Sequence, residues 1–212
     1  MCSGTLVGPR EILTAAHCIA EGPGAAGTRV YVANSRRSVE SAWYHSQYVP
    51  SQSPSESARF DLGMLILSEP VTNMSPIPVL RGRRITRGTK ILIAGYGSNE
   101  RSDDPNRSFR DNFKVGLSRV ILADGNHLFA SHRAFSASAC SGDSGGPAII
   151  AIGKRSLAVA GTLSAGINVS EGGKCYLRGD GTFVEVDLQS VSSRAFLRSF
   201  PGVRYVRANS RR

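Results

Sequence analysis

Three short stretches of the sequence contain residue types that catalyse acyl transfer when they meet: TAAHC at 14–18, FDLGMLIL at 60–67 and CSGDSGGP at 140–147. A serine hydroxyl is a poor nucleophile at neutral pH, so Ser144 would need an adjacent base. His17 suits that role, because the ordinary pKa of histidine, about 6.5, lies close to neutral pH. Asp61 would then orient the imidazole and stabilise its charged form.

Each stretch alone also has a common structural explanation. A histidine after a strand is often a hydrogen-bonded structural residue, and an aspartate before an apolar strand is often a cap. A glycine-rich GDSGG is often only a tight turn. The three stretches together, in the order His, Asp, Ser, favour nucleophilic catalysis over these separate explanations.

The motifs resemble those of trypsin/chymotrypsin-type serine proteases, and the resemblance extends from Cys2 to about Phe200. It implies a serine endopeptidase that works without a metal or cofactor. In such an enzyme His17 is the general base, Asp61 orients it and Ser144 is the nucleophile, which forms an acyl-enzyme. The expected partners are protein or peptide substrates and protein inhibitors of proteases.

The glycines around the nucleophile would form the oxyanion hole. The backbone N–H groups of Gly142 and Ser144 are expected to point at one spot, each stabilising the transition state by a few kcal/mol. In the family, the aspartate matched by Asp143 pairs with an ammonium group that a proteolytic cut releases upstream of the cysteine matched by Cys2. The sequence contains no such upstream segment. We therefore expect the first strand of the first barrel to be missing, and an incomplete, inactive chain is one alternative.

Substrate preference depends, by the same resemblance, on residues around a pocket for the side chain that precedes the scissile bond. Ser138 matches the base of that pocket, and Gly166 and Gly181 match its walls. An uncharged, open pocket favours aromatic or large apolar side chains. Asp180, beside Gly181, keeps a second interpretation open, because its carboxylate would favour a basic side chain.

Two further features of the site follow from the same family. Ser164 matches a serine that hydrogen-bonds the catalytic aspartate. The residues Ser164, Ala165 and Gly166 match a strand edge that pairs with the substrate backbone.

The four cysteines lack the spacing of a zinc site, and an even count in a strand-rich chain indicates two disulfides and an oxidising compartment. The count allows three pairings and does not choose among them. The family resemblance implies two of the possible bonds, Cys2–Cys18 and Cys140–Cys175. We therefore expect a secreted or periplasmic protein, although no signal peptide is present in this sequence.

Short apolar runs between turn residues predict strands that must position these groups. The predicted strands are 2–7, 11–16, 29–33, 39–44, 63–67, 89–94, 115–122, 147–152, 157–163 and 181–187, with one amphipathic helix at 191–200. The fold class is all-β, and the family resemblance makes it two packed six-stranded antiparallel β-barrels with a short C-terminal helix.

The domain boundaries follow from composition. We expect an N-terminal barrel at 1–75, a linker rich in Pro, Arg and Gly at 76–88, a C-terminal barrel at 89–188, a helix at 189–200 and a basic tail at 201–212. Together these segments form one peptidase domain, expected to be a monomer.

The formal net charge of +10 predicts a surface that attracts anions. The basic residues do not follow one helix with interleaved aromatics, so a generally basic surface with weak polyanion binding is favoured over a dedicated polyanion site. A catalytically inactive protease-like fold that binds polyanions or a protein partner remains the alternative function. No apolar stretch is long enough to span a membrane.

Overall fold

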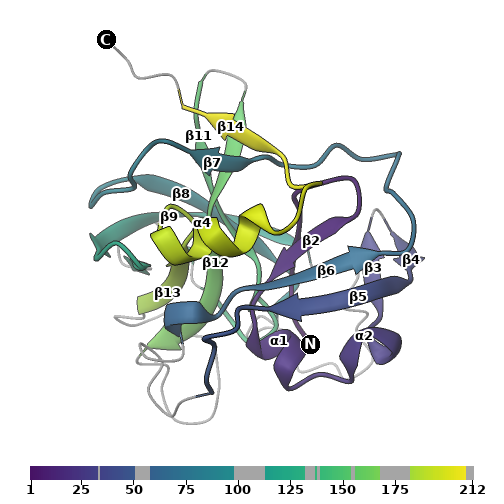
Figure 1. The fold of residues 1–212 in the computed structure, drawn as a ribbon. Coiled ribbons are helices and arrows are strands. Elements are labelled where there is room, and N and C mark those ends of the chain that lie inside the picture. The colour runs from purple at the N-terminus through teal and green to yellow at the C-terminus, as the bar shows by residue number, and fades with distance from the viewer. Residues whose placement is uncertain are drawn as a thin grey trace.

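The computed structural model of the chain describes residues 1–32, 34–50, 58–97, 113–131, 137, 139–153, 156–167 and 182–208. Strands dominate, and one helix of two turns follows them near the C-terminus (Figure 1). The predicted fold class, a trypsin-like all-β pair of barrels with a short C-terminal helix, is confirmed.

Six antiparallel strands close into a barrel in the C-terminal half. Strand β11 pairs with both β8 and β12, and this double pairing closes the ring. The strands in ring order are β11 (Pro147–Ala151), β8 (Lys90–Gly95), β9 (Lys114–Ala123), β10 (His127–Ser131), β13 (Thr182–Asp187) and β12 (Leu157–Ile167). Closure removes the free sheet edges, and the interior is filled by buried side chains such as Leu128, Ile150 and Phe183.

The N-terminal half contains a four-stranded antiparallel sheet and a separate two-stranded one. The larger sheet has the order β1 (Thr5–Leu6), β2 (Glu11–Thr14), β6 (Gly63–Leu67) and β5 (Val39–Tyr44). The smaller one pairs β3 (Val30–Val32) with β4 (Ser35–Arg37). Strand β6 lies between β2 and β5, and both of its faces are buried, with Met64 in one apolar cluster and Leu65 and Leu67 in another. Burial of both faces explains why its sequence is a compact apolar run instead of an alternating one.

Short helices lie between these strands, next to His17 and Asp61. Helix α1 (His17–Ala20) directly follows β2, and α2 (Gly24–Gly27) follows α1. A single 3₁₀ turn, η1 (Ala58–Phe60), precedes Asp61 and β6. The sequence did not predict these short helices, because isolated helices of one turn have no periodic pattern to detect.

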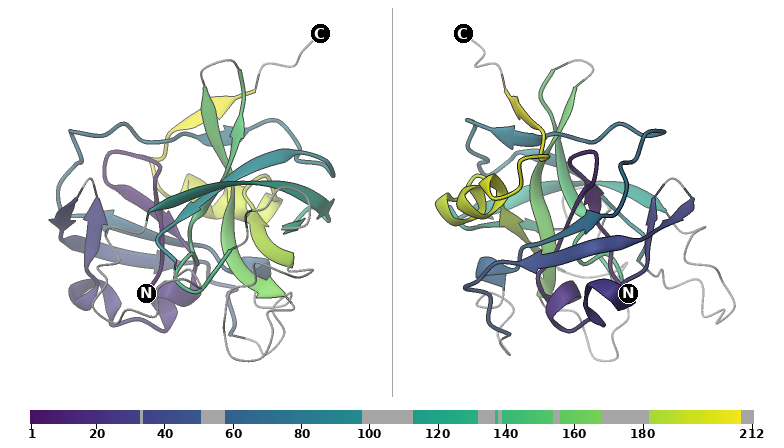
Figure 2. Two further views of the ribbon diagram at one scale, coloured as in Figure 1. Left: turned by 180° about the vertical axis from the view of Figure 1, so that it is seen from behind. Right: turned by 45° about the vertical axis from the view of Figure 1, so that its right-hand side comes forward.

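The C-terminal helix α4 (Val191–Arg198) ends two residues before the predicted boundary. The Ser190 hydroxyl accepts a hydrogen bond from the Ser193 N–H at 3.0 Å, which caps the helix N-terminus. Leu197 is buried against Val7 and Leu13 of the first half and Val159 of the barrel. The helix therefore lies over the junction of the two halves and covers part of the core they share (Figure 2).

Two short strands lie in segments where the sequence predicted no regular structure. Strand β7 (Val79–Arg81) lies within the expected linker at 76–88, and β14 (Tyr205–Arg207) lies within the expected tail. They pair with each other in parallel, and β7 also pairs with β12. The domain boundaries themselves stay a prediction. Within the described part of the chain, no helix is both long and apolar enough to cross a membrane.

Candidate active site

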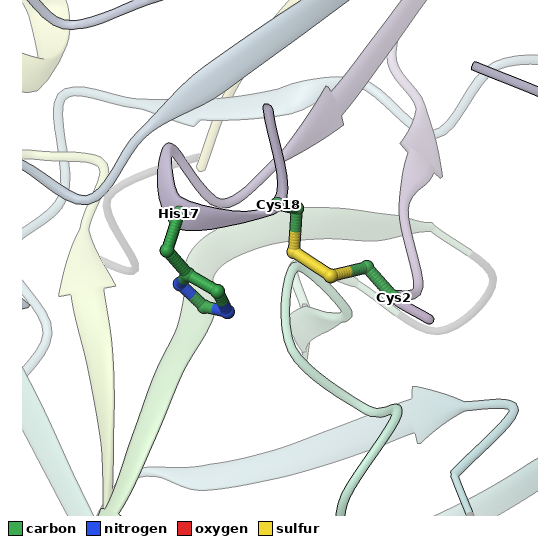
Figure 3. Close-up of side chains that lie close together, drawn as sticks. All are labelled: Cys2, His17 and Cys18. Atoms are coloured by element: carbon green, nitrogen blue, oxygen red, sulfur yellow. A yellow bond between two sulfur atoms is a disulfide. The ribbon is translucent and has the colours of Figure 1, made fainter. Parts of the chain in front are cut away.

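His17 is held at the first residue of helix α1 by the strand before it and the disulfide after it. Cys18 is bonded to Cys2, and the two Cα atoms are 6.1 Å apart (Figure 3). The bond joins the start of the chain to α1 across the β1–β2 hairpin. It is the pairing that the family resemblance implies.

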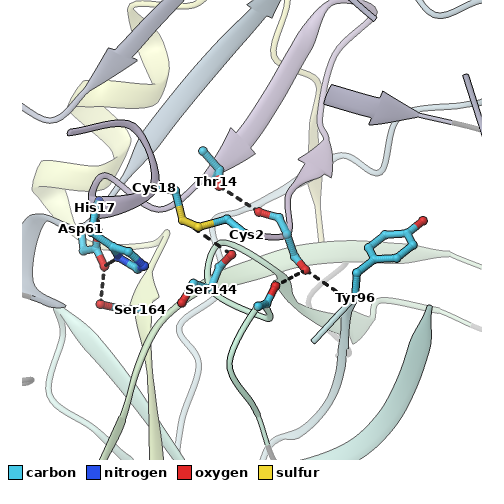
Figure 4. The surroundings of a disulfide bond; sticks show 10 residues. Cys2, Thr14, His17, Cys18, Asp61, Tyr96, Ser144 and Ser164 are labelled. Carbon is cyan, nitrogen blue, oxygen red and sulfur yellow. Dashed lines mark hydrogen bonds and ion pairs between the residues drawn. A yellow bond between two sulfur atoms is a disulfide. The ribbon is translucent and has the colours of Figure 1, made fainter. Parts of the chain in front are cut away.

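Asp61 fixes both the backbone and the ring of His17. Its Oδ1 accepts the His17 backbone N–H at 2.8 Å, and its Oδ2 lies 2.7 Å from His17 Nδ1. The Ser164 hydroxyl donates to Oδ2 at 2.5 Å (Figure 4). Only 2% of Asp61 is exposed, so these hydrogen bonds replace water around a buried carboxylate.

The pairing with Asp61 also decides the protonation of His17. Burial of the ring lowers the pKa of His17, but the hydrogen bond and charge of Asp61, aided by the charge of Glu21, outweigh it and raise the pKa above 6.5. Because Nδ1 faces a carboxylate acceptor, the neutral ring carries its proton there and leaves Nε2 as a proton acceptor. A histidine in this state has the chemistry of a general base.

Ser144 lies in a tight turn just before β11, and its carbonyl oxygen lies 3.8 Å from Sγ of Cys18, the residue after His17. Positive φ angles at Gly142 (+95°) and Gly145 (+82°) allow the turn. A Cβ on Gly145 would also collide with the backbone oxygen of Ser3 and with Thr14, so the glycine permits close packing of the turn on the first sheet. Figure 4 shows Ser144 between the disulfide and the His17–Asp61–Ser164 group. Among the described residues, no hydrogen bond joins the Ser144 hydroxyl to His17.

Two backbone amides of this turn have no acceptor while their neighbours do. The N–H groups of Asp143, Gly145 and Gly146 donate to the carbonyls of Cys140, Leu163 and Asp143. Within the described part of the chain, the N–H groups of Gly142 and Ser144 donate to nothing. A pair of amides left unpaired beside a serine is able to bind a developing negative charge.

The sequence did not identify Ser3, which links the turn to the rest of the site. Its N–H donates to the Ser144 carbonyl at 2.7 Å, and its hydroxyl donates to the Gly142 carbonyl at 2.9 Å. The same hydroxyl accepts the Tyr96 N–H at 3.0 Å, and the Ser3 carbonyl accepts the Thr14 hydroxyl at 2.9 Å. A serine beside a disulfide cysteine carries no sequence signal for this role, because the bonds join segments far apart in the chain.

Asp143, the residue before the nucleophile, is partly buried and held by backbone amides. Gly97 and Cys140 donate their N–H groups to its two carboxylate oxygens at 2.8 and 2.9 Å. Burial raises the pKa of Asp143, although both hydrogen bonds and the charge of Lys114 act in the opposite direction. The Lys114 ammonium donates to the Gly97 carbonyl at 2.6 Å. Among the described residues, no cation forms an ion pair with Asp143.

A cavity of about 200 Å³ lies beside His17 and opens to solvent. The residues that line it are His17, Glu21, Tyr48, Pro50, Asp61, Ser164 and Ala165. Burial, with the charges of Asp61 and Glu21, raises the pKa of Tyr48 to about 12, so its hydroxyl stays protonated. Glu21, Tyr48 and Pro50 were not candidates from the sequence, since nothing in their spacing connects them with His17.

The structure describes some of the remaining predicted site residues and not others. Ala165 and Gly166 belong to β12, and Gly166 is exposed at the cleft end of that strand. Cys140 is disulfide-bonded, but its expected partner Cys175 lies outside the described residues. Ser138, Asp180 and Gly181, which concern the predicted specificity pocket, also lie outside them.

Cys2, His17 and Cys18 each bring one potential metal-ligating atom, and these three atoms lie within 4.8 Å of one another (Figure 3). The two sulfur atoms are bonded to each other, so neither is a thiolate that binds a metal. For the same reason, the 3.8 Å contact of Cys18 Sγ with the Ser144 carbonyl is a packing contact with no proton to share. The cluster therefore supports the position of His17 and is not a metal site.

Comparison with known proteins identifies a family and a related protease. A family model described as Trypsin matches residues 1–186. The chain is also similar to a protein named cercarial protease from Schistosoma mansoni, with 27% identity over 172 residues. That alignment covers 69% of this chain and 64% of the length of the cercarial protease.

Proposed function

This chain belongs to the trypsin family of serine proteases, and we propose that it is an endopeptidase that cleaves peptide bonds through an acyl-enzyme on Ser144. The observation that carries the proposal is the surroundings of His17. A buried carboxylate holds Nδ1, which leaves Nε2 free to accept a proton, and Figure 4 draws Ser144 beside this group. Within the described residues, the turn of Ser144 also has two amides that donate to nothing. These observations support a role for His17, Ser144 and the two amides in acyl transfer.

In the proposed first step, Ser144 Oγ attacks the carbonyl carbon of the substrate and its proton passes to His17 Nε2. The carbonyl oxygen becomes an oxyanion, which the N–H groups of Gly142 and Ser144 stabilise. His17 then gives its proton to the leaving amine as the C–N bond breaks. The products of this step are an ester on Ser144 and a free amine.

Water completes the reaction by the same path. His17 takes a proton from the water as it attacks the ester carbon, and returns that proton to Ser144 Oγ as the C–O bond breaks. Asp61 stays ionised and stabilises the charged imidazole in both steps. We assign Ser164 to the support of Asp61, through the hydrogen bond of 2.5 Å.

The substrate preference that we propose rests on the residues that match the family's pocket, not on the described geometry. We propose that Ser164, Ala165 and Gly166 pair with the substrate backbone, which is supported by the position of Gly166 at the exposed end of β12. We further propose a preference for large apolar or aromatic residues before the scissile bond, with Ser138 at the pocket base and Gly166 and Gly181 in its walls. A preference for basic residues through Asp180 is the alternative outcome of the test below.

The disulfide and the family match both support a protein that works in an oxidising compartment. We therefore propose a secreted or periplasmic peptidase that acts on protein substrates and is open to protein inhibitors. The monomer expected from the sequence remains part of this proposal.

A peptide library tests both activity and preference. The purified protein is incubated with mixed peptides, and the products are sequenced by mass spectrometry, with Ser144→Ala as the matched control. We expect new peptide termini that the Ser144→Ala variant does not produce, with Phe, Tyr or Leu before the cut. Cuts after Arg or Lys would favour the alternative, a preference for basic residues through Asp180. Identical digests from both proteins would reject peptidase activity at Ser144.

A further inference from the structure

Strands β7 and β14 bring together arginines from two distant parts of the chain. Their parallel pairing sets Arg207 directly opposite Arg81, and both side chains are exposed. Like charges at paired strand positions repel each other and destabilise the pair. The sequence could not show this contact, because the segment that contains Arg207 was expected to be a tail.

Helix α4 extends the same charged surface. Arg194 and Arg198 are four residues apart, so they lie on one face of the helix, and both are exposed. The Arg81 guanidinium lies over the Tyr205 ring of β14. Burial raises the pKa of Tyr205, while the charges of Arg81 and of Arg198 from the helix both lower it. The strand pair and the helix therefore present their guanidinium groups together.

Arg84 joins this surface through a shared carboxylate. Burial raises the pKa of Asp187 to about 6, and the charges of Arg194 and Arg84 both act to lower it. Only 5% of Asp187 is exposed, so it does not neutralise the surface that solvent meets. We call Arg81, Arg84, Arg194, Arg198 and Arg207 the arginine surface.

The arginine surface forms no ion pair among the described residues, and Asp187, the carboxylate on which Arg84 and Arg194 act, is buried. In the described parts of the chain, none of its five arginines forms an ion pair with a carboxylate, whereas Arg10 pairs with Glu40 elsewhere in the protein. Five exposed guanidinium groups without acidic partners attract anions strongly and repel one another. Each binds a sulfate, phosphate or carboxylate with two parallel hydrogen bonds.

We propose that the arginine surface binds a linear sulfated polysaccharide. The guanidinium groups are distributed over two strands and a helix, which fits a chain of repeated anionic groups better than one small anion. Single-stranded nucleic acid is a poorer fit, because its bases are bound by stacking on open aromatic rings. Here the Arg81 guanidinium lies 5.3 Å from the centre of the Tyr205 ring and covers it.

The arginine surface and the catalytic cleft lie in different parts of the molecule. In Figure 1, β7 and β14 are at the top of the molecule, and α1, which carries His17, is at the bottom. A polysaccharide bound to the strand pair would leave the cleft open to peptides. This binding is therefore a second property of the protein and does not depend on the proposed peptidase activity.

The test compares two double variants that remove the same charge. Arg81→Gln/Arg207→Gln changes the arginine surface, and Arg29→Gln/Arg36→Gln removes two exposed arginines from the N-terminal half. Binding of the full chain to heparin is measured by calorimetry at about 0.15 M salt, where weak long-range attraction is screened. We expect the first variant to bind at least about tenfold more weakly, since two charge-assisted contacts are lost, and the control to change less than about threefold.

A second pair, Arg84→Gln/Arg198→Gln, leaves the β7–β14 strands untouched and should show the same loss. Unchanged thermal unfolding temperatures confirm that the variants are folded. Equal losses in the surface and control variants would reduce the effect to net charge and overturn the proposal. Absence of heparin binding by the parent protein would overturn it too, as would tighter binding of single-stranded DNA with the same sensitivity to the arginine variants.

Discussion

Two buried carboxyl groups, Asp61 in the cleft and Glu185 inside the C-terminal barrel, have opposite surroundings. Asp61 accepts hydrogen bonds from the backbone and ring of His17 and from Ser164. Glu185 is 0% exposed, and neither of its oxygens has a hydrogen-bond partner among the described residues. Burial, followed by the charge of Asp143, raises the pKa of Glu185 well above its usual value.

The difference shows that burial alone does not determine whether a carboxyl group works as a charge. Asp61 has donors arranged around it, which makes it suited to stabilise a positive imidazole. Glu185 lacks them, so its neutral form is favoured and it belongs to the barrel interior. Asp143 lies between these cases, with two backbone amides but no ion pair within the described residues.

The largest expected effect is a loss of activity when Asp61 is substituted, which we do not expect when Glu185 is substituted. Asp61→Asn should lower kcat by about 10⁴-fold with little change in KM, because the amide favours the wrong tautomer of His17. Glu185→Gln is an equally conservative change and should leave kcat unchanged. Peptide hydrolysis at pH values near neutrality measures both variants. A similar kcat in both variants would show that the surroundings of Asp61 have no catalytic role.

A smaller effect is expected at the turn that Ser3 supports. Ser3→Ala removes the donor to the Gly142 carbonyl and leaves the Tyr96 N–H without its acceptor. The expected result is a loss of stability of about 1–3 kcal/mol and a fall in kcat of about tenfold, as the oxyanion amides lose their fixed position.

Ser118→Ala is the matched control for Ser3, since the buried Ser118 hydroxyl donates to the Ser131 carbonyl inside the barrel. We expect this variant to lose stability but keep its kcat, as measured by denaturation and peptide hydrolysis. An equal fall in kcat for both variants would attribute the effect of Ser3 to general destabilisation.

The carboxyl group of Glu185 should affect stability through pH. Its pKa in the folded protein lies above the unfolded value of 4.5, so the folded state keeps a proton that the unfolded state releases. Its contribution to stability therefore falls as the pH rises from 4.5 through the folded pKa. Glu185→Gln abolishes this loss, and the variant should become progressively more stable than the parent protein as the pH rises. Denaturation curves at several pH values measure the difference in free energy of unfolding between the variant and the parent protein. A difference that does not change with pH would contradict a raised pKa of Glu185.

The smallest expected effect concerns the charge of Glu21 near His17. The base must be neutral to act, so activity appears as the pH rises through the His17 pKa, which lies above 6.5. Glu21→Gln removes a charge that raises this pKa and should move the acid limb of kcat/KM to lower pH. Glu69→Gln removes the same net charge from an exposed position outside the cavity and should leave the limb in place.

The sequence predicted the parts of this molecule that have local patterns. The strands at 39–44 and 63–67 were found with their observed boundaries, because each is a short run of strand-forming residues between turns. Strands β4, β7, β10 and β14 were missed, since they are short and begin or end with His, Tyr or Arg.

The residues of the candidate site also divide into those that a local sequence motif indicates and those that it does not. Motifs pointed to His17 and Asp61, and the structure brings these two together. Nothing local pointed to Ser3 or Glu21, because their importance comes from contacts between segments that meet only in the folded protein. The arginine surface was likewise invisible, since it depends on a strand pair that the sequence did not predict.

The most direct test of the proposed roles of Ser144, His17 and Asp61 is reaction with a fluorophosphonate probe, followed by mass spectrometry of the labelled peptide. We expect one adduct, on Ser144, and a labelling rate that rises with pH through the His17 pKa. The labelling rate should be much lower in Asp61→Asn. Glu185→Gln should label at the parent rate. No adduct on Ser144, or equal labelling rates in the parent protein and Asp61→Asn, would contradict the proposed roles of Ser144, His17 and Asp61.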